Sequence, residues 1–179
     1  MLTTVEFGKP CDKALSLAVG YFDGVHLGHR TLLAEITRLS AAHGTAPAVS
    51  TFADSPKNGE NIYGYDERRR LLSDCGMEIC LSLYYLRVCG MRGEEFFALL
   101  TDLYDVRDIV CGENYTFGSD RCDVGKLGEL CWAKGISLTV MPLYDYCGVR
   151  VASTAVKTFL RTGDVDAAKK LLGMPYHIR

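Results

Sequence analysis

The chain has 179 residues, a formal net charge of −2 and an apolar content of 48%. Its length favours a single domain over residues 1–179, and its near-neutral charge excludes the global basic field by which proteins attract nucleic acid. No apolar run approaches the roughly 18 residues of a membrane span, and the first six residues have neither the basic start nor the apolar core of a signal peptide, so we expect a cytoplasmic protein without a membrane partner.

The first thirteen residues are predicted to form a short lead-in or an edge strand, after which strand and helix patterns alternate. Strands are expected at 14–19, 46–52, 78–85, 106–111 and 136–143. Helices are expected at 30–43, 65–75, 93–104, 124–134, 153–161 and after Asp164. Residues 53–64 are predicted to be a mobile loop, and residues 144–152 a loop or short strand. The alternation predicts an α/β fold with a five-stranded parallel sheet and helices on both faces.

Eight cysteines are spread along the chain without a C-x-x-C pair, and no cluster of cysteine and histidine has the spacing of a zinc site. Several of them lie within apolar segments such as residues 78–81 and 108–111. We interpret them as reduced and mostly buried thiols, and we expect no metal site built from protein side chains alone.

The most informative stretch is residues 20–29, which read G-Y-F-D-G-V-H-L-G-H and follow the first expected strand. A glycine-rich turn between a strand and a helix places free backbone N–H groups where they favour an anion, and its glycines allow close backbone approach. His26 and His29 are three residues apart, so both can point toward the same phosphate and donate hydrogen bonds, or a charge when protonated. The stretch matches neither a Walker A loop nor G-x-G-x-x-G. For H-x-G-H alone, a turn with two incidental histidines is an equal alternative.

The full pattern G-x-F-D-G-x-H-x-G-H resembles the nucleotidylyltransferase module of bacterial FAD synthetases, which is usually the N-terminal half of a bifunctional riboflavin kinase/FMN adenylyltransferase. The resemblance covers residues 14–179 and implies a Rossmann-like nucleotidylyltransferase fold, with no riboflavin kinase domain in this sequence. It also implies the reaction of ATP with FMN to give FAD and pyrophosphate. Mg²⁺ would enter with ATP and sit mainly on substrate oxygens. Nucleotide base selectivity and oligomeric state are left open.

Residues 150–157 (R-V-A-S-T-A-V-K) form a second candidate phosphate site. Ser153 is predicted to be the N-cap of a helix, with Lys157 one turn further on and Arg150 on the other side. Taken alone, the stretch is better explained as a capped helix with solvated basic residues. It resembles the R-x-x-S-T-x-[IV]-[RK] segment that contacts ATP phosphates in the family. The family more often has arginine where this chain has Lys157, so we expect a lower affinity for ATP.

Residues 112–118 (G-E-N-Y-T-F-G) are similar to the family loop that faces the flavin. The resemblance implies that Asn114 orients the FMN phosphate and that Tyr115 or Phe117 stacks near the isoalloxazine ring, although Phe117 is equally suited to the core. Residues 51–56 (T-F-A-D-S-P) match a family loop that closes over the flavin, but they lack its first proline and its basic residue. Arg68 matches the family pattern E-[KR]-x-x-L-L at a helix start.

The resemblance and the motifs together give three groups of candidate site residues. The catalytic residues are His26, His29 and Lys157. The residues for ATP and its phosphates are Gly20, Phe22, Asp23, Gly24, Gly28, Arg150, Ser153 and Thr154. The residues for the flavin are Asn114, Tyr115, Phe117, Thr51, Phe52 and Arg68. Asp23 is either a Mg²⁺ ligand or a residue that holds the turn, and we favour the structural role.

The sequence offers no catalytic triad or nucleophilic cysteine, and FMN brings its own ionised nucleophile, so we expect catalysis by positioning and charge stabilisation. The histidines are expected at the α- and β-phosphates, and residues 153–157 at the leaving pyrophosphate. Two alternatives stay open. The altered residues 51–56 allow a different phosphorylated acceptor, and Lys157 together with the missing kinase module allows a non-catalytic flavin- or nucleotide-binding regulator.

Overall fold

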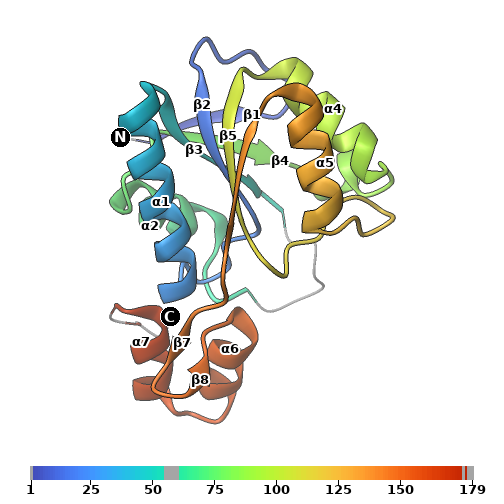
Figure 1. The fold of residues 1–179 in the computed structure, drawn as a ribbon. Helices are drawn as coiled ribbons and strands as arrows, with labels where there is room; N and C mark the ends of the chain where they lie inside the picture. The colour runs from blue at the N-terminus through green and yellow to red at the C-terminus, as the bar shows by residue number, and fades with distance from the viewer. Residues whose placement is uncertain (1, 55–60, 175, 177–179) are drawn as a thin grey trace.

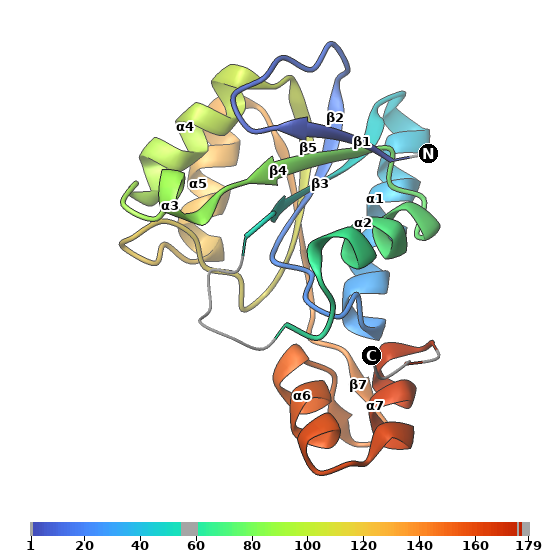
Figure 2. The ribbon, with the colours of Figure 1, turned by 180° about the vertical axis from the view of Figure 1, so that it is seen from behind.

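The computed structural model describes residues 2–54, 61–174 and 176, and Figures 1 and 2 show a central sheet with helices on both of its faces. The strands of this sheet are parallel and follow the spatial order β1-β4-β3-β2-β5-β6. They are β1 (Thr3–Glu6), β2 (Leu15–Val19), β3 (Ala46–Phe52), β4 (Ile79–Leu83), β5 (Val106–Gly112) and β6 (Ser137–Met141). The expected α/β class is confirmed, and the sheet has six strands in place of the expected five.

The additional strand is β1, which pairs with β4 at one edge of the sheet. Thr3 and Thr4 are exposed, whereas Val5 and Glu6 are partly buried. Because a short edge strand buries little apolar surface, its sequence lacks the continuous apolar run that marks the inner strands. Of the two alternatives for the first thirteen residues, the edge strand is therefore the correct one.

The helices of the described residues begin and end close to the expected positions. They are α1 (Leu27–His43), α2 (Tyr65–Asp74), α3 (Tyr85–Val88), α4 (Gly93–Leu103), α5 (Val124–Lys134), α6 (Ser153–Arg161) and α7 (Val165–Leu172). The short helix α3 was not expected, and α1 begins three residues earlier than predicted, so that His29 lies in its first turn. No helix in the described part of the chain is long and apolar enough to cross a membrane.

The central strand β2 shows why the two faces of the sheet are both apolar. Leu15 and Leu17 are fully buried on the face covered by α4 and α5, while Ala18 is fully buried against α1 and α2. A strand that is covered on both faces needs apolar residues at most successive positions. The one polar residue of β2, Ser16, is buried with its hydroxyl hydrogen-bonded to Asp108 and Thr45.

The part of the chain that follows β6 leaves the sheet and forms a smaller unit below the carboxyl ends of the strands (Figure 1). It contains the hairpin of β7 (Asp145–Tyr146) and β8 (Val149–Arg150), followed by α6 and α7. Val156 of α6 and Leu172 of α7 are fully buried together with Ile62 from the loop before α2. This apolar cluster attaches the unit to the rest of the domain and places the start of α6 beneath the sheet.

Candidate active site

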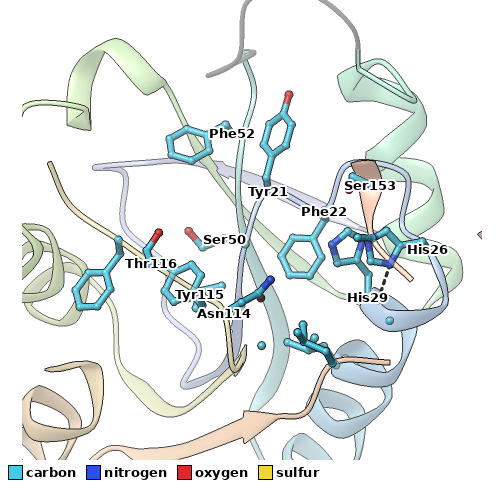
Figure 3. Close-up of a pocket in the computed structure, with 18 of the residues that line it drawn as sticks. Tyr21, Phe22, His26, His29, Ser50, Phe52, Asn114, Tyr115, Thr116 and Ser153 are labelled. Atoms are coloured by element: carbon cyan, nitrogen blue, oxygen red, sulfur yellow. Dashed lines mark hydrogen bonds between the residues drawn. The ribbon is translucent and has the colours of Figure 1, made fainter. Parts of the chain in front are cut away.

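A cavity of about 820 Å³ lies at the carboxyl ends of the central strands (Figure 3). Its wall comes mainly from the turn after β2, the loop after β5 and the segment that leads into α6. The strand β2 connects through α1 to β3 on one side of it, whereas its other neighbour, β5, connects through α5 to β6 on the opposite side. The two chain connections therefore run in opposite directions from the carboxyl ends of β2 and β5. Open α/β sheets bind ligands at such a position.

The turn after β2 has an unusual backbone. Phe22 and Val25 adopt positive φ angles of 53° and 43°, and both side chains are buried. Gly24 has a φ of 88°, and a Cβ atom there would lie 2.8 Å from the Cδ1 atom of Ile62. Glycine adopts this φ without strain, and a side chain at this position would also have to displace the end of the Ile62 side chain. Backbone strain of this kind is concentrated at functional sites.

His26 and His29 lie against each other at the start of α1. Their rings stack with centroids 3.6 Å apart, and Phe22 packs beside His29 with a centroid separation of 5.2 Å. His26 is the N-cap of α1, because its Nδ1 atom accepts a hydrogen bond of 3.3 Å from the backbone N–H of His29 (Figure 3). In the neutral ring, an accepting Nδ1 leaves the proton on Nε2, which can donate to a ligand.

Burial makes both imidazoles neutral at pH 7. It lowers the pKa of His26 to about 4, against a smaller opposing effect of the Asp23 carboxylate. It also lowers the pKa of His29 well below 6.5, and the neighbouring His26 lowers that pKa further. The Nδ1 atom of His29 is buried without a hydrogen-bond partner in the described part of the chain. In the ligand-free protein the pair therefore presents neutral rings, whose N–H groups can donate hydrogen bonds to a ligand.

Ser153 and Thr154 line the cavity at the start of α6. Ser153 is not the N-cap, however, because Ala152 occupies that position without a side-chain hydrogen bond. The Ser153 hydroxyl instead donates to the backbone oxygen of Asp23 at 2.8 Å. This hydrogen bond joins the two predicted phosphate motifs, which are separated by 130 positions in the chain. Arg150 also lines the cavity, but its guanidinium is paired with Asp145 across the hairpin.

Lys157 does not line the cavity. Its Nζ atom lies 2.6 Å from Oδ2 of Asp23, whose other oxygen accepts a hydrogen bond of 2.8 Å from the backbone of Ile62. Asp23 thus joins the turn after β2, the loop before α2 and helix α6. This arrangement is the one expected of a residue that holds the turn.

The loop after β5 places aromatic side chains on the opposite side of the cavity from the histidines. Tyr115 and Phe117 stack with centroids 5.9 Å apart, and Phe117 is 7% exposed, so it belongs to the core and also lines the cavity. Asn114 lies between these rings and the histidine pair (Figure 3). Phe52 lines the same side of the cavity from the end of β3.

Two residues predicted to contact the flavin have other partners. Arg68 is only 1% exposed and is absent from the cavity wall. Its guanidinium donates to the backbone oxygens of Tyr21 and Phe52, both at 2.7 Å, and stacks on the Tyr21 ring. Thr51 is fully buried and donates to the same Tyr21 oxygen at 2.8 Å. Both residues lie behind the cavity wall, where they hold its backbone by hydrogen bonds, and neither lines the cavity.

Several further residues of the cavity wall were missed by the sequence analysis. They are Tyr85, Val88, Cys89, Phe96, Ser119, Arg121 and Tyr144. The first three follow the end of β4, and the position of that strand end at the carboxyl edge of the sheet was an available signal. Residues 55–60, which include Ser55 and Pro56 of the predicted flavin loop, lie outside the described residues.

Metal-binding side chains are not grouped in the described part of the chain. It contains no cluster of three or more His, Cys, Asp or Glu residues that could hold an ion. The described cavity wall contains no carboxylate, and the Asp23 carboxylate is engaged with Lys157 and Ile62.

Comparisons with known proteins connect this site with flavin chemistry. The model of the FAD synthetase family matches residues 8–155. An FAD synthetase of Listeria monocytogenes is 30% identical over 177 residues, which cover 93% of this chain and 71% of the relative. The bifunctional riboflavin kinase/FMN adenylyltransferases of Pseudomonas fluorescens and Escherichia coli are 29% and 28% identical, over 95% and 90% of this chain. The chain spans 58% and 55% of the lengths of these two relatives.

The fold is also similar to that of a solved structure. A crystal structure titled as a macrolide-efflux protein from Streptococcus pneumoniae superposes with a TM-score of 0.87 and 26% sequence identity. The matched region covers 98% of this chain and 63% of that one.

Proposed function

Because this chain belongs to the FAD synthetase family, we propose that it transfers AMP from ATP to FMN and so forms FAD and pyrophosphate. The observation that carries the proposal is the stacked pair of neutral histidines at the start of α1, which faces an aromatic-lined cavity large enough for two substrates. The chain covers only part of the length of its bifunctional relatives, so the activity, the substrates and a cytoplasmic location are parts of this proposal. The cysteines, all of them free, support that location.

The chemistry is an in-line displacement at the α-phosphorus of ATP. An oxygen of the FMN phosphate forms the new P–O bond, and the bond to the pyrophosphate oxygen breaks. The FMN phosphate is already ionised, so no protein base is needed to remove a proton. The Nε2–H group of His26 and the free backbone N–H groups at the start of α1 are placed to donate to the α-phosphate oxygens as negative charge develops there. His29, stacked on His26, would add a further hydrogen-bond donor for the same phosphate.

The leaving pyrophosphate would lie at the start of α6. Ser153 and Thr154 line the cavity there, next to the free N–H groups of the first helical turn. Lys157 must release Asp23 before it can contact a phosphate, and Arg150 must likewise release Asp145. We propose that phosphate binding drives these exchanges of partner.

The flavin would occupy the opposite side of the cavity. Asn114 lies between the two regions and can hold the FMN phosphate near the α-phosphorus (Figure 3). Phe52, Tyr115 and Phe117 supply the apolar surface that a planar ring system requires. Mg²⁺, carried by the ATP phosphates, would neutralise charge on the pyrophosphate.

The proposal is tested by incubating the protein with ATP, Mg²⁺ and FMN and separating the products by chromatography. FAD and pyrophosphate are expected in equal amounts, and a parallel reaction with riboflavin in place of FMN should give no FAD. Bound ATP without formation of FAD would overturn the proposal. Screening phosphorylated acceptors with ATP and CTP would then separate a different acceptor from a non-catalytic regulator.

A further inference from the structure

Arg121 is a positive side chain on the flavin side of the cavity that the sequence analysis did not select. It lies in the loop between β5 and α5, is exposed, and lines the cavity. The described cavity wall contains a second arginine, Arg150, and no carboxylate. Arg150 is paired with Asp145, whereas the Arg121 side chain has no hydrogen bond or ion pair within the described residues. Its guanidinium is therefore available to a ligand.

The loop that carries Arg121 is firmly attached to the domain. Phe117 and Cys122 form a β-bridge, with a hydrogen bond of 3.0 Å from the Phe117 N–H to the Cys122 oxygen. Asp120 accepts a hydrogen bond of 2.8 Å from the backbone N–H of Gly93 at the start of α4. The backbone N–H of Ser119 donates to the Met91 oxygen at 2.8 Å. These contacts anchor the loop on both sides of Arg121.

The backbone of Arg121 has a φ of 54°, a conformation that costs free energy for a residue with a side chain. Its N–H donates to the Gly118 oxygen at 3.2 Å, so the turn is closed in this conformation. Glycine or asparagine would satisfy the backbone better. The arginine is thus held in an unfavourable backbone conformation at the wall of the cavity.

The position of this loop indicates which part of a substrate it meets. The histidines begin α1 on one face of the sheet, whereas the loop packs against α4 on the other face (Figures 1 and 2). The neighbouring cavity wall is apolar and aromatic, with Val88, Phe96 and Phe117. In the proposed reaction the FMN phosphate lies near the histidines, so the ring system lies on the side of Arg121. The polar groups of that ring are carbonyl oxygens and ring nitrogens, which match the planar set of donors of a guanidinium.

We propose that Arg121 recognises the isoalloxazine ring by donating hydrogen bonds to the carbonyl oxygens of its pyrimidinedione edge. This inference rests on the proposed function and adds a residue that determines flavin specificity. Arg121 contacts the ring and not the FMN phosphate, so it contributes to the binding of phosphorylated and unphosphorylated flavins alike.

The test compares the binding of FMN and riboflavin to wild-type protein and to Arg121→Gln, followed by quenching of flavin fluorescence. Loss of a charged hydrogen bond should raise the Kd of both flavins by about tenfold, because such a bond contributes roughly 1.5 kcal/mol or more to binding. The Kd for ATP should be unchanged, and the KM for FMN should rise with little change in kcat. Arg107→Gln is the matched control, because Arg107 is an exposed arginine at the other end of β5, paired with Asp105.

Arg121→Gly separates recognition from folding. It should be at least as stable as the wild type, because glycine adopts the positive φ without strain, and it should still lose flavin affinity. Unchanged affinity for both flavins, or a loss confined to FMN, would overturn the assignment of Arg121 to the ring. Failure of the wild-type protein to bind either flavin would be a different result, because it would remove the proposed function and this inference together.

Discussion

Lys157 and Asp23 form an ion pair behind the cavity wall, with their Nζ and Oδ2 atoms 2.6 Å apart and their side chains 17% and 3% exposed. The pair joins the turn after β2 to helix α6, and the Ser153 hydroxyl bonds the backbone of the same aspartate. The residues expected to hold ATP phosphates are thus also the residues that attach α6 to the sheet. If these residues bind phosphate as proposed, phosphate binding and the position of α6 should be coupled through the Asp23 carboxylate.

Loss of one partner of this ion pair should destabilise the protein more than loss of both. Asp23→Asn leaves a buried ammonium without a counter-ion, and we expect it to lower the free energy of unfolding by about 3 kcal/mol. Adding Lys157→Met removes that uncompensated charge and should restore much of the loss. Urea denaturation of the wild type, both single variants and the double variant measures the coupling. Additive effects of the two substitutions would show that the pair contributes nothing.

His29→Ala should lower kcat by about a hundredfold to a thousandfold, because it removes a donor at the developing charge on the α-phosphate. The change in the free energy of unfolding should be much smaller than the change in activation free energy, because the His29 ring is not the N-cap of α1. Single-turnover formation of FAD measures the effect, and circular dichroism checks the fold. Turnover within a few-fold of the wild type would contradict the role given to His29.

The pH dependence of stability should contain a contribution from His26. Its folded pKa of about 4 lies below the unfolded value of 6.5, so the unfolded chain binds protons first as the pH falls. The contribution to stability is complete above pH 6.5 and is lost progressively as the pH falls toward 4, by up to about 1.4 kcal/mol per pH unit.

His26→Asn provides the matched comparison, because asparagine is a good N-cap and does not titrate in this range. Urea denaturation between pH 4.5 and 7 should give a shallower dependence on pH for this variant than for the wild type. Parallel curves for the two proteins would mean that His26 titrates normally in the folded state.

Asp108 should be important for stability and unimportant for catalysis. It is 1% exposed at the end of the sheet away from the cavity, where it accepts a hydrogen bond of 2.6 Å from Ser16. The Nδ1 atom of His43 lies 3.0 Å from both of its carboxylate oxygens. Asp108→Ala would remove a buried hydrogen-bond acceptor of Ser16, which would keep Thr45 as a partner, and would leave His43 to water, so we expect a loss of about 1–3 kcal/mol in the free energy of unfolding. The kcat of the folded fraction should be unchanged. A large fall in kcat would indicate that the two ends of the sheet are coupled.

The sequence was sufficient to predict the positions of the inner strands and of the longer helices. β3, α5 and α6 begin and end at the predicted residues, because each has a continuous or periodic apolar pattern that its own residues encode. The short elements β1 and α3 lack such a pattern, since they bury little surface and owe their conformation to neighbours. The turn motif was recognisable for a related reason: Gly24 adopts a positive φ that glycine allows without strain, so this part of the turn is encoded locally.

The partners of long polar side chains could not be predicted in the same way. Arg68, Lys157 and Ser153 all matched a pattern for contact with a substrate, yet each bonds a segment that is distant in the chain. A helical pattern shows where such a side chain starts, but the loops that its end meets are brought there by folding. Arg121 was missed for the converse reason, because a single arginine in a polar loop has no local pattern. Only the packing of that loop against α4 places Arg121 at the wall of the cavity, since contacts between distant segments fix the position of a loop that its own sequence leaves free.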